Sequence, residues 1–98
     1  MNEPVVLRDE ARAEFEEAFD FQERRRAGSG VLFVARVQDV FDRIVANPSW
    51  HAPVFADIRK AAVVRFPYRV FSRVEPTRVE VIAVFHTSRD PSVWRGRA

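Results

Sequence analysis

The spacing of apolar residues divides the chain into a helical first half and an extended second half. Between residues 9 and about 26, apolar positions recur at i, i+4 and i+7, and charged residues occupy the opposite side. Gly28-Ser29-Gly30 interrupts this pattern, and the same spacing then continues to Asn47, which precedes a proline. The first half therefore predicts two amphipathic helices joined by a short glycine turn, with Ser29 as candidate N-cap of the second.

The other segments have the period-two character of strands. A short β-branched run at 5–7 precedes the first helix, and the segments 58–65, 68–74 and 78–87 are rich in Val, Ile and Phe. Short bends containing proline separate these segments and favour antiparallel neighbours, whereas residues 49–57 are expected to form a loop. The order β-α-α-β-β-β predicts an α+β fold, with a helical hairpin on one face of a small, mainly antiparallel sheet and a short C-terminal tail.

The last predicted strand is apolar on both faces in its middle part. Its apolar residues alternate across the two faces, with Val81, Ala83 and Phe85 on one side and Ile82 and Val84 on the other. The helical hairpin can cover only one of these faces. The second face is therefore left for something else, such as a partner protein.

Length and composition narrow the class of protein. A chain of 98 residues with 47% hydrophobic residues predicts one folded domain over residues 1–98. The chain has no cysteine, which excludes disulfides and thiolate metal sites and suits a reducing cytoplasm. A run of about 18 apolar residues and a signal peptide are both missing, so we expect neither a membrane span nor secretion. No metal or nucleotide motif appears, and we expect no cofactor.

Charge is distributed unevenly along the chain. Residues 1–57 contain 11 acidic and 7 basic side chains, whereas residues 58–98 contain 3 acidic and 9 basic ones. Arginine supplies nearly all of the bases, and its planar group forms bidentate pairs with carboxylates and phosphates. A GC-rich genome can explain arginine in place of lysine, but it does not explain why the acids avoid the second half. The basic half is therefore a candidate binding surface.

Two blocks in this basic half resemble the ParE branch of the RelE/ParE toxins. The first is Arg65-Phe66-Pro67-Tyr68-Arg69-Val70-Phe71, similar to an "RFPY" block of that family. The second is His86-Thr87-Ser88-Arg89-Asp90-Pro91 with Trp94 and Arg97 behind it, similar to the closing block of the family. The helical pair and its glycine turn precede them in the family's order, so the resemblance covers almost the whole chain.

The resemblance implies the toxin of a bacterial type II toxin–antitoxin module. Such a toxin is held inactive in a hetero-oligomer by an acidic antitoxin, here ParD-like, whose C-terminal segment wraps around it. ParE toxins are associated with poisoning DNA gyrase, and RelE toxins with cleaving mRNA on the ribosome. We expect a non-enzymatic gyrase inhibitor, with a ribosome-dependent mRNA endonuclease as the alternative.

Candidate residues for binding follow from charge and position. An apolar sheet face with strand arginines can receive an acidic segment. The predicted antitoxin-binding residues are Arg59, Arg65, Arg69, Phe71 and Arg73; the alternative is that the arginines are plain outward-facing strand positions. The predicted target-binding residues are Arg89, Trp94 and Arg95; for Trp94 the alternative is that it packs the tail onto the sheet.

Candidate residues for catalysis apply only to the endonuclease. RNA cleavage needs proton transfer and stabilisation of charge on the phosphate, for which His86, Arg89 and Arg65 are the candidates. His86 has no neighbouring second base in the sequence, and Arg89 can instead pair locally with Asp90. The only tyrosine, Tyr68, is expected to pack with its hydroxyl bonded. The sequence therefore favours binding over catalysis.

Overall fold

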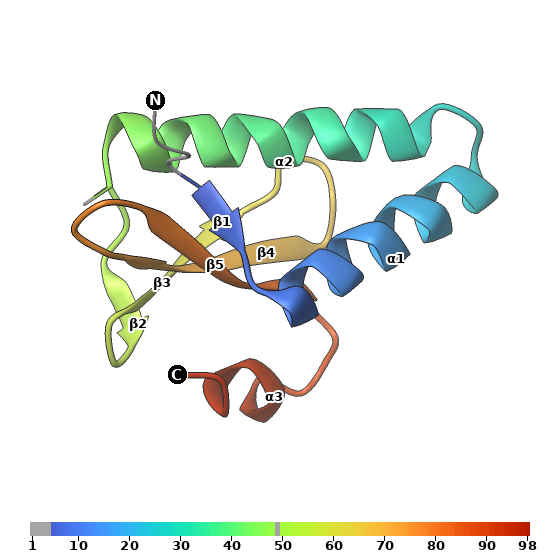
Figure 1. Cartoon of the computed structure of the whole chain (residues 1–98). Helices are drawn as coiled ribbons and strands as arrows, with labels where there is room; N and C mark the ends of the chain where they lie inside the picture. Colours follow the sequence, from blue (N-terminus) through green and yellow to red (C-terminus); the bar gives the residue numbers. More distant parts are fainter. Residues whose placement is uncertain (1–4, 49) are drawn as a thin grey trace.

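The computed structural model describes residues 5–48 and 50–98, whose elements are shown in Figure 1. In chain order these elements are β1 (Val5–Leu7), α1 (Asp9–Arg25), α2 (Ser29–Ala46), β2 (Pro53–Phe55), β3 (Ile58–Ala62), β4 (Tyr68–Val74), β5 (Val79–His86) and α3 (Ser92–Arg95). The strands of the described residues form one five-stranded sheet in the order β1-β5-β4-β3-β2. β1 pairs with β5 in parallel, and the other pairs are antiparallel. The predicted α+β fold with a mainly antiparallel sheet is confirmed.

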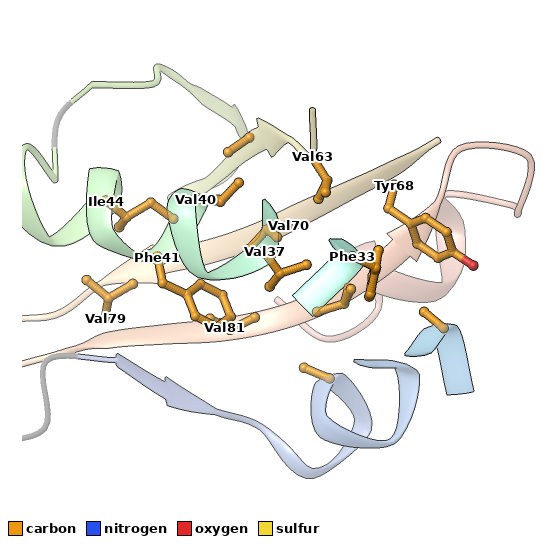
Figure 2. Packing of buried hydrophobic residues seen from close by; sticks show 14 residues of the cluster. Phe33, Val37, Val40, Phe41, Ile44, Val63, Tyr68, Val70, Val79 and Val81 are labelled. Atoms are coloured by element: carbon orange, nitrogen blue, oxygen red, sulfur yellow. The ribbon is translucent and has the colours of Figure 1, made fainter. Parts of the chain in front are cut away.

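The helical hairpin covers one face of this sheet. α2 turns its apolar stripe towards the strands, as Figure 2 shows for Phe33, Val37 and Phe41, which gather with Val70 and Val81 in one cluster. Phe33 and Val37 are fully buried. Burying an apolar side chain of this size stabilises the fold by about 2 kcal/mol. The helix-period spacing of the sequence therefore identified the side of each helix that forms the core.

The turn between α1 and α2 is closed by a carboxylate and not by Ser29. Gly28 occupies the N-cap position of α2 with φ of 89°, a conformation that favours glycine. The carboxylate of Glu23 accepts hydrogen bonds from the N–H groups of Gly28 and Gly30, both at 2.9 Å. These bonds, the one from Gly28 first, lower the pKa of Glu23. The prediction of Ser29 as N-cap was wrong, because Glu23 reaches the same donors from the preceding helix.

Two strand predictions need correction. The expected loop at 49–57 contains β2, a short and exposed edge strand that starts at Pro53 and pairs with β3. An edge strand tolerates proline because one side of its backbone has no strand to bond. β3 ends at Ala62, three residues before the predicted end at Arg65. Arg65 has φ of 72° and belongs to a tight turn in which the N–H of Phe66 donates to the carbonyl of Val63.

A β-bulge in β5 changes which residues share a face. Phe71 pairs with Ala83 and the adjacent Ser72 pairs with Val81, so Ile82 is an extra residue without a partner on β4. Val81 and Val84 consequently join the core under the helices, whereas Ile82 and Ala83 both join a cluster on the opposite face. The strict alternation predicted for this strand was wrong at its middle.

Candidate functional site

The sheet face opposite α1 and α2 is covered by the chain's own C-terminal helix. α3 lies on that side of the sheet (Figure 1), and its Trp94 is only 5% exposed. The Trp94 indole stacks on Phe71, with ring centroids 4.0 Å apart. Trp94 therefore packs the tail onto the sheet, and the apolar face that the sequence left for a partner is already covered. Phe71, a predicted antitoxin-binding residue, is 5% exposed beneath this indole.

One largely buried carboxylate holds the C-terminal segment in this position. Glu14 of α1 accepts two hydrogen bonds from Arg97, at 2.9 and 3.1 Å, and one from Arg89 at 3.2 Å. It also accepts the N–H of Val84, next to the bulge, at 3.1 Å. Arg97 donates in addition to the carbonyl of Ile82. Sequence reasoning missed Glu14, because its partners lie at least 70 positions away along the chain.

Between α3 and the sheet lies a groove of about 320 Å³ that we call the basic groove. Its charged side chains come from β3, β4, α3 and the segment after β5, namely Lys60, Arg69, Arg95 and Arg89. Lys60 lies opposite Phe71 in the strand pairing, and Arg69 opposite Phe85, which places both cations beside the buried rings. None of the residues that line the groove is acidic. Within the described residues, Lys60, Arg69 and Arg95 form no ion pair.

His86 lies at the end of β5, between the basic groove and a second groove. Its Nδ1 accepts the N–H of Ser88 at 3.0 Å and lies 2.7 Å from the Ser88 hydroxyl oxygen. When Nδ1 accepts a hydrogen bond from a backbone N–H, the neutral ring carries its proton on Nε2. Arg89 stacks over the Phe85 ring, with its guanidinium carbon 4.2 Å from the centroid, and pairs with Glu14 instead of Asp90.

The second groove, of about 430 Å³, lies between α1 and β5 and has a different character. It is lined by Glu14 and Glu17 as well as Arg24, His86 and Tyr68. Burial raises the pKa of Tyr68, and a hydrogen bond with Gln22 offsets part of this shift. Tyr68 is therefore a packed aromatic with a bonded hydroxyl, as its position in the sequence predicted.

The predicted antitoxin-binding arginines do not form one surface. Arg59 donates to the His51 carbonyl at the helix-covered side. Arg73 lies on the opposite face, where it pairs with Asp57 at 2.9 Å and Glu80 at 3.5 Å. Arg65 is exposed in the turn before β4, and only Arg69 lines the basic groove.

The other predicted site residues gather more closely. Arg89, Trp94 and Arg95, expected to bind the target, all line the basic groove. Of the endonuclease candidates, His86 and Arg89 line the groove, while Arg65 does not. In the part of the chain that the structure describes, no group of three His, Asp or Glu side chains could hold a metal ion. The helices described are too short or too polar to cross a membrane.

Comparison with known proteins identifies relatives at the level of family and fold. Residues 5–91 match the family described as the ParE toxin of the type II toxin–antitoxin system parDE. A solved structure of the chromosomal ParDE TA system from P. aeruginosa has a similar fold, with a TM-score of 0.72. It is 12% identical in sequence, and the match covers 84% of this chain and 92% of that one. No curated protein matches this chain significantly.

Proposed function

Since the chain belongs to the ParE toxins of type II toxin–antitoxin systems, we propose that it stops growth by binding DNA gyrase through the basic groove. The observation that carries the proposal is the gathering of Lys60, Arg69 and Arg95 in one groove whose lining contains no acidic residue. Cations that form no ion pair among the described residues are available to an anionic partner outside the protein. Binding at this groove would place the toxin on the gyrase–DNA complex without any chemical step by the toxin itself.

The partner that restrains the toxin is a ParD antitoxin, because the family is that of parDE systems. We propose that an acidic part of this antitoxin reaches Arg69 and Arg95 in the basic groove, and that the toxin resides in the cytoplasm with it. Oppositely charged surfaces speed association and select the partner. The exposed turn at Arg65 and the paired Arg73 are secondary candidates for the same contact.

A supercoiling assay tests the gyrase proposal. Purified toxin is added to gyrase, relaxed plasmid and ATP, and supercoiled and linear products are measured. We expect inhibition, and we expect Arg69→Gln/Arg95→Gln to need at least tenfold more toxin, because each lost charged contact costs about 1.5 kcal/mol or more. Arg12→Gln/Arg26→Gln, which changes the charge equally on exposed residues of the helical hairpin, is the control. Equal inhibition by the two double variants would contradict the proposal.

One observation supports the alternative of a ribosome-dependent mRNA endonuclease. His86 and four cations line the same groove, which combines a proton-transfer group with phosphate neutralisation. The test is His86→Ala in a translation reaction, with cut mRNA located by primer extension. Loss of both cleavage and toxicity would support the endonuclease. Undiminished toxicity of His86→Ala would count against it and leave gyrase as the target.

A further inference from the structure

The chemistry of the basic groove identifies its ligand more closely than family membership does. We propose that the groove binds a phosphodiester backbone, so that the toxin contacts the DNA held by gyrase as well as the enzyme. This inference rests on the proposed function for the source of the DNA, but not for the binding itself. Four cations from four separate segments surround the groove, and a nucleic acid presents a repeating row of negative charge to match them.

Three of the four groove cations have no acidic partner among the described residues, and only Arg89 pairs with a carboxylate, that of Glu14. Lys60 and Arg95 are exposed and Arg69 is half-buried, and among the described residues none of the three has an acidic partner within ion-pair distance. Other arginines, such as those at the end of α1, also lack an ion pair in the described part of the chain, but they lie on a helix that carries several acidic side chains. In the groove, three unpaired cations meet where no lining residue is acidic, which is typical of an anion-binding surface.

The buried rings of the groove favour a phosphate backbone over a peptide that would bind mainly through apolar contacts. Protein interfaces derive most of their affinity from aromatic and aliphatic groups that become buried on binding. The three rings here, Phe71, Phe85 and Trp94, are already only 3–5% exposed, because they pack on one another. An incoming chain would therefore find charged heads and little free apolar surface. Val54 at the rim, 47% exposed, and Phe55 beside Arg95, 40% exposed, are the exceptions.

The cations are also held at a fixed spacing by rigid elements. Lys60 and Arg69 are on paired strands of the sheet, and Arg95 is on α3, which Trp94 and the Glu14–Arg97 pair fasten to it. Arg89 is fixed from both sides by the Phe85 ring and Glu14. A preorganised row of donors loses little entropy when it binds successive phosphates.

Fluorescence anisotropy on the full chain tests this inference without gyrase. The probes are a fluorescein-labelled 12-mer single strand, the matching duplex, and a labelled Glu/Asp-rich peptide of similar charge, measured at several NaCl concentrations. We expect one or both DNA probes to bind, with a slope of log K against log salt of about −3 for four contacts with the single strand. The preferred probe shows whether the groove takes single or double strands.

Variants locate the binding to the groove. Arg69→Gln/Arg95→Gln should weaken DNA binding about tenfold or more and reduce the salt slope to about −1.5, because two phosphate contacts are lost. Arg12→Gln/Arg26→Gln should keep both the affinity and the slope within about twofold. Circular dichroism of both double variants shows that they are folded.

Three results would overturn the inference: no DNA binding at 50 mM salt, equal weakening by both double variants, or binding of the acidic peptide alone. The last result would assign the groove to a protein partner. A toxin that inhibits gyrase but fails to bind DNA would overturn this inference and leave the proposed function intact. A toxin that binds DNA through the groove but has no effect on gyrase would support this inference and contradict the proposed function.

Discussion

Glu14 joins three parts of the chain that are far apart in sequence: α1, the bulge of β5 and the C-terminal segment. Its side chain is 10% exposed, and its carboxylate accepts four hydrogen bonds, three of them from guanidinium groups. A buried carboxylate is stable only when such donors replace its water. Through Arg89 and Arg97, Glu14 helps to position the segment after β5 and α3 at the edge of the basic groove.

Replacing Glu14 by Gln should therefore lower the free energy of unfolding by about 2 kcal/mol, because the negative charge is lost and the amide NH2 cannot accept the bonds that one carboxylate oxygen receives from these donors. We also expect α3 to detach more readily, which would expose Trp94. Urea unfolding, followed by tryptophan fluorescence in a Trp50→Phe background, measures both effects. Glu17→Gln, an exposed change on the same helix, should cost less than about 0.5 kcal/mol. An equally small cost at Glu14 would contradict the role assigned to it.

His51 is a second residue whose surroundings determine its charge. Burial, followed by repulsion from Arg43 and Arg59, lowers its pKa. Its Nε2 is buried and has no hydrogen-bond partner among the residues that the structure describes. The folded state therefore favours the neutral ring, whereas the unfolded chain takes up a proton at the ordinary histidine pKa of about 6.5.

The stability that this residue contributes is complete above that ordinary pKa and is lost as the pH falls towards the lowered value. We expect the unfolding free energy to fall between pH 7.5 and pH 5.5, and to fall less in His51→Asn. Urea unfolding at three pH values measures the difference. Parallel decreases in the two proteins would show that His51 is not responsible.

At the scale of elements, the backbone of Gly30 at the start of α2 lies very close to the end of α1. This contact explains why glycine occupies a position that the sequence pattern treats only as a helix breaker. A Cβ on Gly30 would lie 2.9 Å from the Phe19 carbonyl oxygen and from the Glu23 Cβ. The two helices can therefore meet at this angle only when residue 30 has no side chain. The same contact brings the Glu23 carboxylate to the backbone N–H groups of the turn.

Gly30→Ala should consequently destabilise the fold by about 1–3 kcal/mol, since the helices must move apart. Thermal unfolding measures this change. Gly96→Ala is a suitable control, because the added Cβ would lie 3.4 Å or more from its neighbours and φ there is −65°. The control should be neutral or slightly stabilising. Equal melting temperatures for Gly30→Ala and the wild type would mean that the turn adapts without cost.

For the whole molecule, the two apolar clusters lie on opposite faces of the same strands. Val70 and Val84 belong to the cluster under the helices, and the adjacent Phe71 and Phe85 belong to the cluster under Trp94. Loss of β4 or β5 would therefore open both clusters together. The clusters are linked a second time by Glu14, which joins α1 to the C-terminal segment.

We accordingly predict a single cooperative unfolding transition for residues 1–98. Helix content, followed by circular dichroism, and the burial of Trp94, followed by fluorescence in the Trp50→Phe background, should share one midpoint in urea. An earlier fluorescence transition would instead show that α3 unfolds independently of the sheet.

The sequence by itself determined the elements and the family. Helix-period and strand-period patterns require only neighbours along the chain, so they located α1, α2, β4 and β5 to within one or two residues. The blocks around Arg65–Phe71 and His86–Trp94 indicated the ParE toxins for the same reason, since each is continuous in sequence. The excess of bases after residue 57 likewise predicted a basic surface.

Tertiary structure alone decided which of these residues act together. The bulge at Ile82 moved part of β5 to the other face, and Trp94 then covered the apolar surface that the pattern had left open. Arg73 and Arg97 form ion pairs with acidic residues of the protein. Lys60, Arg69 and Arg95, by contrast, lie in one groove of the described structure and form no ion pair there. These outcomes depend on contacts between distant segments, and local patterns contain no information about such contacts.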